Sequence, residues 1–175
     1  MVANSRRAHG FTLVELMITI AIAGTLMAIA IPGNRTLLAG QKMKTATLDL
    51  VTTAMQARSE AIKWSGASSS SISIVAASND FANGWCIVFT SATACSTSAP
   101  SDAVMQVMKA TTGVTYAYQG TYAPITFTRT GRLSGGVAVT IRVTDNEGAA
   151  MPRCVTFDTN GNARVRVMAT ASTAC

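Results

Sequence analysis

Few residues in this sequence could do catalytic chemistry. His9 is the only histidine among the 175 residues, and it lies in a short polar stretch at the N-terminus. Ser-His-Asp and Cys-His nucleophiles and HExxH zinc sites all need a histidine in the folded domain. A paired-carboxylate mechanism needs two acids in one cleft, whereas acids at loops and turns are ordinary. The sequence therefore predicts no catalytic residue, no cofactor and no enzymatic activity. The acids at expected loops and turns are Asp80, Asp102, Asp145, Glu147 and Asp158.

Four cysteines, Cys86, Cys95, Cys154 and Cys175, are the next candidates. They include no CxxC pair, which together with the missing histidine argues against a zinc site. Four cysteines in an exported domain favour two disulfide bonds, for which three pairings are possible. Sequence neighbourhood suggests Cys86–Cys95 and Cys154–Cys175. The second bond would close a loop of about twenty residues, worth roughly 3 kcal/mol.

Asp158, Asn160 and Asn162 match the start of a calcium loop, D-x-N-x-N. Ala163 stands where that loop needs glycine, and Ala169 where it needs a bidentate glutamate. A hairpin turn explains the same residues, because Asn-Gly is favoured in tight hairpins. We expect no metal site here.

Arginine dominates the charge of the C-terminal part. The chain has a net charge of +6, and no lysine follows residue 125. Strand alternation predicts that Arg164 and Arg166 share an exposed face while Val165 and Val167 point to the other side. Such a face could bind DNA phosphates independently of sequence, or it could be a solvated sheet face or a contact between subunits. The arginines are Arg129, Arg132, Arg142, Arg153, Arg164 and Arg166.

The N-terminal segment has the pattern of a membrane-spanning helix that follows a short basic flank. Residues 1–10 are polar and basic, and residues 11–31 are apolar apart from three threonines and Glu15. A helix over residues 11–31 measures about 31 Å, close to a hydrocarbon core of about 30 Å. The basic flank predicts that residues 1–10 stay cytoplasmic. No small-residue cleavage site follows the apolar run, unlike a secretory signal, and Glu15 needs a partner in such a segment.

Gly10-Phe11-Thr12-Leu13-Val14-Glu15-Leu16 resembles the signature of type IV prepilins and pseudopilins. The resemblance implies that a prepilin peptidase cleaves after Gly10, that Phe11 becomes the methylated N-terminus, and that Glu15 pairs with the terminal amine of a neighbouring subunit. The alternative is a plain membrane anchor with Glu15 at the headgroup level. Pro32 is expected to kink the helix where it leaves the membrane.

Beyond Pro32 the pattern becomes amphipathic. Leu48, Val51, Met55 and Ile62 fall at helical spacing, so we expect the helix to continue to about Trp64 with this apolar stripe packed on the C-terminal domain. Residues 57–62, Ala-Arg-Ser-Glu-Ala-Ile, resemble the helix end of the minor-pilin subgroup usually called GspH or FimT. Their charges alone would indicate a solvated helix face.

From Ser71 onward the sequence predicts short β-strands separated by turns, the last two forming a hairpin. Residues 84–89, Gly-Trp-Cys-Ile-Val-Phe, are similar to a Gly-Trp-x-x-Phe strand of the same subgroup with one extra residue, and Trp85 and Phe89 are expected in the core. The strands are expected at 71–76, 85–90, 103–108, 115–118, 125–129, 137–144, 154–158 and 163–168.

Some members of the resembled family bind DNA through a C-terminal Gly-Arg-x-Arg motif. Here the corresponding stretch runs from Gly161 to Arg166, and its first arginine, Arg164, is not adjacent to the glycine. Arg164 and Arg166, with Arg132 and Arg129, are the candidate DNA contacts.

The expected fold is the α+β type IV pilin fold. It comprises a cleaved leader (1–10), a long helix (11–64) whose half at 11–31 serves membrane insertion and assembly, and a β-rich domain (65–175). The resemblance implies a minor pilin at or near the tip of a type IV pilus, which moves from the bacterial inner membrane into the extracellular fibre. Its partners would be other major and minor pilins and the prepilin peptidase. The alternatives are a double-stranded DNA receptor for natural transformation and a minor pseudopilin of type II secretion.

Overall fold

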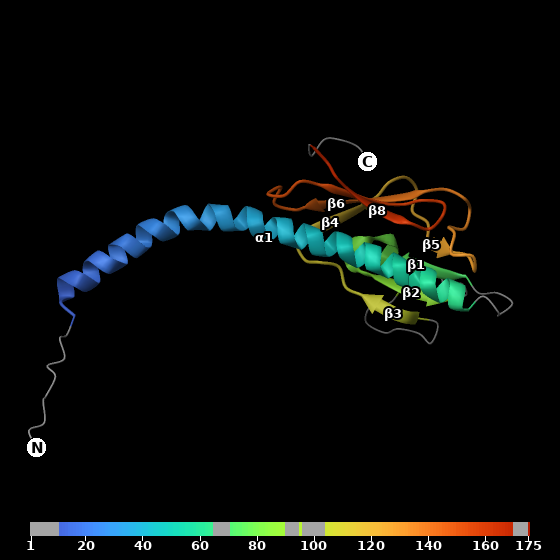
Figure 1. Ribbon diagram of the computed structural model, residues 1–175, viewed down its shortest axis with the longest axis horizontal. Helices are drawn as coiled ribbons and strands as arrows, with labels where there is room; N and C mark the ends of the chain where they lie inside the picture. Colours follow the sequence, from blue (N-terminus) through green and yellow to red (C-terminus); the bar gives the residue numbers. More distant parts are fainter. Residues whose placement is uncertain (1–10, 65–70, 90–94, 96–103, 170–174) are drawn as a thin grey trace, which may run out of the picture. The chain divides into compact units, whose positions relative to one another are not determined.

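The described part of the chain forms one long helix and two antiparallel sheets (Figure 1). The computed structural model describes residues 11–64, 71–89, 95, 104–169 and 175, without the side chains of residues 29–33. By its internal contacts the chain divides into two compact units, Met1–Leu37 and Leu38–Cys175. The second half of the helix therefore belongs to the β-rich unit. The predicted leader, Gly10 included, lies outside the described residues.

The helix α1 (Leu13–Lys63) begins with a side-chain cap. Thr12 Oγ1 accepts a hydrogen bond from the backbone N–H of Glu15 at 3.2 Å, and Thr12 O accepts one from Leu16 N at 3.2 Å. A threonine followed three residues later by glutamate is a common helix-start pattern, because it satisfies backbone donors that have no partner within the helix. The helix continues through residue 32. The Pro32 side chain is not among those described, so the expected kink stays a prediction.

The buried face of α1 in the Leu38–Cys175 unit is lined mostly by small residues. The predicted apolar stripe is wrong, because Leu48 is 49%, Met55 60% and Ile62 48% exposed, and only Val51 is partly buried against the core. Small side chains let the helix backbone approach the sheets closely, so tight packing, not local hydrophobicity, selects the buried face. The buried apolar residues of α1 are Ala39, Met43, Ala46, Leu50, Ala54, Ala57 and Ala61.

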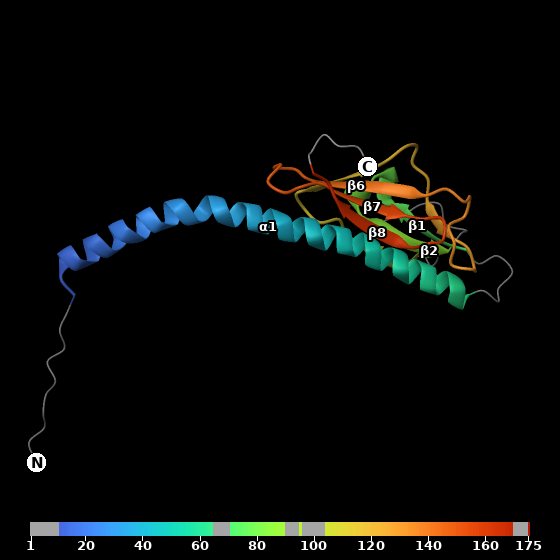
Figure 2. The same cartoon turned by 45° about the horizontal axis from the view of Figure 1, so that its top comes forward.

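Two four-stranded antiparallel sheets pack with α1, in agreement with the expected α+β fold of a long helix and a β-rich domain. The first has the order β3-β2-β1-β5 and the second β4-β6-β7-β8, and Figure 2 shows β6, β7 and β8 side by side. Each strand overlaps its predicted range, and β7 and β8 form the expected hairpin. The elements after α1 are β1 (Ile72–Ala76), the 3-10 turns η1 (Ala77–Asn79) and η2 (Phe81–Asn83), β2 (Trp85–Phe89), β3 (Val104–Met108), β4 (Val114–Tyr118), β5 (Ile125–Phe127), β6 (Val139–Asp145), β7 (Arg153–Phe157) and β8 (Ala163–Val167).

Trp85 joins β2 to α1 in the centre of the core. Its side chain is fully buried, and its Nε1–H donates to Thr53 Oγ1 at 3.1 Å. The Thr53 hydroxyl in turn donates to Asp49 O at 2.6 Å, so neither buried polar group lacks a partner. Phe89 was expected in the core beside Trp85, but it is only partly buried, with its ring edge-on to Trp64 at 5.5 Å between centroids.

The four cysteines form the two disulfides that sequence neighbourhood suggested, Cys86–Cys95 and Cys154–Cys175. Cys86 lies with Val75 and Val88 in a second, smaller apolar cluster, against which Cys95 is partly buried. Alternation along β1 and β2 places this cluster on the face opposite the main core. The first disulfide therefore holds Cys95 against the outer face of the first sheet.

Candidate functional site

The first half of α1 exposes apolar side chains on all sides. Phe11 is 83% exposed, and no residue from 11 to 28 is buried. A helix that is apolar all round needs an apolar environment that its own chain does not supply. The expected membrane span over residues 11–31 is not confirmed: among the residues that the structure describes, no helix is long and apolar enough to cross a bilayer. The other large exposed residues here are Leu13, Val14, Leu16, Met17, Ile18, Ile20, Ile22, Leu26 and Met27.

Glu15 is the exceptional side chain of this segment. Thr19 and Thr25 donate their hydroxyls to the carbonyls of Leu16 and Ile22, each at 2.8 Å, so both are satisfied within the helix. Glu15 uses its backbone N–H for the Thr12 cap, and within residues 11–28 the structure records no partner for its carboxylate. In an apolar environment an unpaired carboxylate is costly, so a cation from outside the chain would stabilise this segment.

Arg164 and Arg166 lie on the outer face of the second sheet, and both are exposed, as predicted. Directly paired residues share a face, and the pairing Arg166–Cys154–Arg142 adds Arg142 to the same face. Sequence reasoning left Arg142 out of the candidate set because only strand pairing brings it there. Val165 and Val167 point to the opposite face, as predicted, and they are 42% and 56% exposed.

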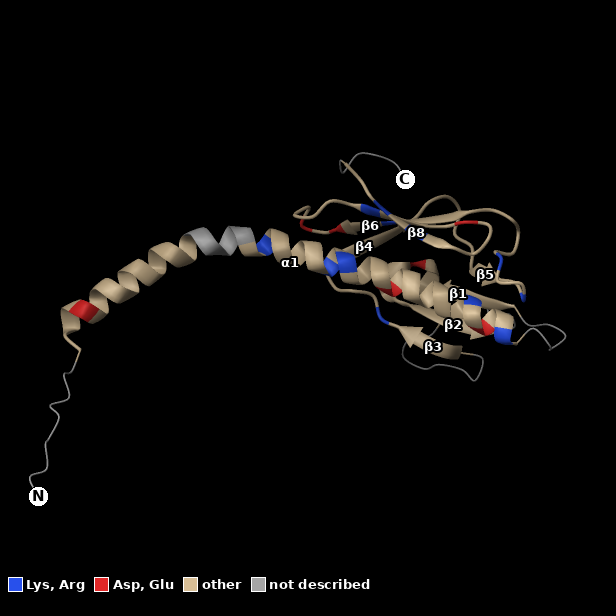
Figure 3. Ribbon diagram, in the orientation of Figure 1, with Lys and Arg blue, Asp and Glu red and all other residues tan. Residues whose placement is uncertain are grey.

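Arg129 and Arg132 are exposed in the turn after β5. This turn packs on the β7–β8 turn, where Leu133 N donates to Thr159 O at 3.2 Å. The turn bearing these two arginines therefore lies next to the turn that leads into Arg164. Figure 3 shows the basic residues of the chain in blue, including those on the second sheet and its neighbouring turns.

Arg58 fixes the β7–β8 turn to α1. Its Nη1 donates to Asn162 Oδ1 at 3.0 Å and to Gly161 O at 3.4 Å. A Cβ on Gly161 would overlap the carbonyl oxygen of Gly131, and both glycines have positive φ, +81° and +73°. The expectation that the charges of residues 57–62 form a solvated face is therefore wrong for Arg58. The missed signal is the pair of glycines, which allows two turns and a guanidinium to meet.

Asp158 is used by the same turn. Its Oδ1 accepts hydrogen bonds from Asn160 N at 3.0 Å and Asn162 N at 2.9 Å. The hydrogen bond from the Asn162 backbone N–H is the main cause that lowers the pKa of Asp158 below 3.8. Among the described residues no three histidine, cysteine or acidic side chains come together to hold a metal ion. The residues that match the start of a calcium loop therefore form a hydrogen-bonded turn.

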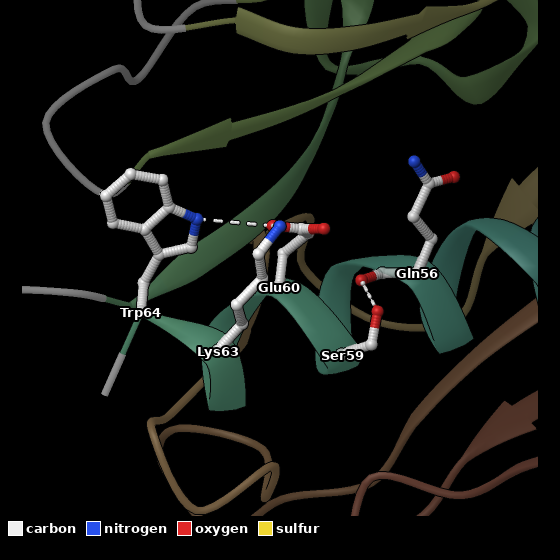
Figure 4. Close-up of polar contacts among 5 residues, drawn as sticks. All are labelled: Gln56, Ser59, Glu60, Lys63 and Trp64. Carbon is white, nitrogen blue, oxygen red and sulfur yellow. Dashed lines mark hydrogen bonds and ion pairs between the residues drawn. The ribbon is translucent and has the colours of Figure 1, made fainter. Parts of the chain in front are cut away.

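The end of α1 carries a small polar cluster (Figure 4). Glu60 Oε2 accepts from Trp64 Nε1 at 3.2 Å and lies 3.5 Å from Lys63 Nζ. Ser59 Oγ donates to Gln56 O at 2.8 Å. These are local contacts along one helix, so they fix the orientation of Trp64 rather than form a binding site.

A cavity of about 370 Å³ lies between the loops that flank β5. Its polar lining residues are Tyr118, Gln119, Thr121, Thr126 and Ser134, and the others are apolar or glycine. None of its lining residues is an acid, histidine or lysine, so the cavity offers no general acid or base of suitable pKa at neutral pH.

An apolar helical start with one acid, followed by an amphipathic half packed on antiparallel sheets, defines the class of type IV pilin-like proteins. Two family models match: the prokaryotic N-terminal methylation motif over residues 5–31, and the type II transport protein GspH over residues 46–161. The second match covers more than half of the chain. The protein therefore belongs to the GspH family of pilins and pseudopilins, whose members are structural proteins.

Two crystal structures of one minor pilin agree on the fold. The type IV minor pilin FimU of Pseudomonas aeruginosa superposes with a TM-score of 0.53 at 20% identity, covering 73% of this chain and 89% of FimU. A second crystal form of FimU gives 0.51 at 21% identity, covering 71% and 91%. The minor pseudopilin EpsH of the Vibrio cholerae type 2 secretion system gives 0.48 at 12% identity, covering 75% and 99%. No curated protein sequence matches closely enough to count as a relative.

Proposed function

We propose that this protein is a non-enzymatic minor pilin of a type IV pilus, incorporated at or near the tip to prime or support assembly. The observation that carries the proposal is the Glu15 carboxylate, for which the structure records no partner within a helical segment of exposed apolar side chains. Cleavage after Gly10 by a prepilin peptidase would create a positive amine at Phe11. That amine on a neighbouring pilin is a suitable partner for Glu15.

Assembly would satisfy two physical demands of the segment together. The apolar side chains of residues 13–27 would leave the inner membrane for the apolar interior of the fibre, so their burial would be preserved. The carboxylate would gain an opposite charge at short range in a medium of low dielectric, where one unpaired charge is expensive. This accounts for an acid at a fixed distance from the new N-terminus.

Incorporation into the fibre tests the role of Glu15. Glu15→Ala should lower the amount of this protein in sheared pili, relative to the membrane fraction, by about tenfold or more, since a loss of 1.4 kcal/mol already gives tenfold. Thr19→Val is the matched control, because the Thr19 hydroxyl bonds only to its own helix. Equal incorporation of Glu15→Ala and the wild type would refute the pairing.

A strain that lacks this protein distinguishes a role in a type IV pilus from a role in type II secretion. We expect loss of twitching motility and of surface pili with protein secretion unchanged. The similarity to FimU supports this choice, although the matching family model is described as a type II transport protein. If the strain lost only protein secretion, this protein would instead be a minor pseudopilin of type II secretion.

DNA uptake is a second candidate function, supported by the outer face that carries Arg142, Arg164 and Arg166. Contact would be to phosphates of double-stranded DNA and would weaken as salt rises. In a gel shift with the detergent-solubilised full chain, Arg164→Ala with Arg166→Ala should reduce the salt slope by about two. Lys42→Ala with Lys109→Ala controls for net charge, because both lysines are exposed and lie outside the second sheet. No shift of the wild type at low salt would end this candidate.

A further inference from the structure

Among the residues that the structure describes, β8 is an edge strand, and no hydrogen bond is recorded for its outer backbone groups. It is last in the order β4-β6-β7-β8, and no other described strand pairs with it. Asp158 N bonds to Asn162 O and Met168 N to Pro152 O, so the even-numbered residues of β8 face β7. By alternation, the N–H and C=O groups of Ala163, Val165 and Val167 point away from the sheet.

Apolar side chains lie beside this free edge on the core-facing side. Val165 is paired with Val155, which is fully buried, so the two side chains share the inner face. Val165 and Val167 are nevertheless 42% and 56% exposed. Exposed edge strands are normally protected by lysine, proline or a bulge, because a bare edge pairs with other chains. β8 contains no lysine, proline or bulge, and the charged side chains that it carries, Arg164 and Arg166, both lie on the outer face.

The exposed stripe of α1 lies on the same side of the helix as the β7–β8 turn. Arg58 reaches Gly161 O and Asn162 in that turn. Met55 and Ile62 are three and four residues from Arg58, and helical positions at these spacings share a face. Leu48 lies seven residues before Met55 on that face. These three side chains are 48–60% exposed, so the described part of the chain leaves apolar surface uncovered here.

We propose that the β8 edge binds an extended segment of a different protein, which adds a fifth strand to the second sheet. Backbone hydrogen bonds would come from Val165 and Val167. On the inner face the segment would present apolar side chains toward Val165, Val167 and the Leu48–Met55–Ile62 stripe. On the outer face it would present acids opposite Arg164 and Arg166. The partner is therefore recognised by an alternating apolar and acidic sequence.

A second copy of this chain does not fit the edge. Antiparallel pairing of two β8 strands about Val165 would place Arg164 directly opposite Arg166 twice, and like charges directly opposite are unfavourable. A partner with acids at these positions turns both repulsions into attractions. The inference goes beyond the proposed function, because it concerns the folded Leu38–Cys175 unit and does not require Glu15 pairing or a particular machine.

A synthetic peptide can test the edge directly. The probe is a labelled nine-residue peptide in which valine and glutamate alternate, and binding to the detergent-solubilised full chain is followed by fluorescence anisotropy. We expect saturable binding that falls about tenfold or more when the glutamates become lysines. Arg164→Glu with Arg166→Glu should reverse this preference. No binding at millimolar peptide, or equal binding of both peptides by the wild type, would overturn the proposal.

A backbone variant separates strand addition from simple charge attraction. Val165→Pro removes an outward N–H without removing a β7–β8 hydrogen bond, and edge strands tolerate such a proline. It should weaken peptide binding about tenfold, whereas Val165→Thr, which keeps the N–H and the branched shape, should retain it. Unchanged tryptophan emission would show that both variants fold. If Val165→Pro bound the peptide normally, or if double-stranded DNA bound with no dependence on Val165, the surface would be a charge site and not a strand edge.

Discussion

Replacing Gly161 by alanine should destabilise the Leu38–Cys175 unit more than a glycine replacement usually does. Gly161 has a φ of +81°, and its added Cβ would meet the Gly131 carbonyl oxygen. That oxygen cannot easily move, because Gly131 N donates to Thr128 O at 2.8 Å and Leu133 N donates to Thr159 O at 3.2 Å. The two turns would have to separate, which would also lengthen the Arg58 contact with Gly161 O.

The magnitude follows from two costs. A left-handed backbone conformation costs alanine about 1–2 kcal/mol, and overpacking against a rigid neighbour adds about 1–3 kcal/mol. The free energy of unfolding should therefore fall by about 2–5 kcal/mol. With a urea slope of about 2 kcal/mol per molar, the midpoint should drop by about 1–2.5 M.

Urea unfolding of the full chain in a non-ionic detergent, followed by tryptophan fluorescence, measures this loss. Trp64 and Trp85 are the two tryptophans of the chain, and both belong to the Leu38–Cys175 unit, so the signal reports on that unit. Gly148→Ala is the matched control, because Gly148 has a φ of +67° with no atom within 4 Å of an added Cβ. If Gly148→Ala and Gly161→Ala lowered the midpoint equally, the close approach of the two turns would not be a stabilising constraint.

Three further outcomes follow from the same contacts. Arg58→Met should lower the unfolding free energy by about 1 kcal/mol in urea melts, because it loses two hydrogen bonds to the β7–β8 turn; no change would refute the clamp. Replacing both Cys154 and Cys175 by alanine should lower the unfolding free energy by about 3 kcal/mol under oxidising conditions. A difference in unfolding free energy from the wild type that persisted in reductant would contradict this. Asp158 has a lowered pKa in the folded state, so its charged form stabilises the turn above pH 3.8 and this contribution is lost as the pH falls through the folded pKa. The difference in melting temperature between Asp158→Asn and the wild type should therefore shrink below about pH 4, and a constant difference would refute the assignment.

Local sequence patterns predicted the positions of the strands well. β8, for example, was expected at residues 163–168 and is found at Ala163–Val167. Alternation, β-branched residues and Asn-Gly turns act over a few residues, so the chain encodes them locally. The same holds for the apolar run that precedes Pro32, because it depends only on neighbours in sequence.

The buried face of α1 could not be obtained in this way. Hydrophobic periodicity selected Leu48, Met55 and Ile62, yet the sheets pack against alanines on another face. Periodicity reports which face is apolar, whereas burial depends on how closely two surfaces can approach. The three side chains that the periodicity selected are about half exposed in the structure.

The sequence by itself determined the prepilin-like segment, the acid at Glu15, the eight strands and the most suitable cysteine pairs. Only the tertiary structure decided that Arg58 holds the β7–β8 turn, that Arg142 joins Arg164 and Arg166 on one face, and that the β8 edge lies free beside apolar surface. Each of these depends on residues far apart in the chain, up to 104 positions for Arg58 and Asn162. Contacts of that separation are set by strand order and sheet packing, which no local pattern specifies.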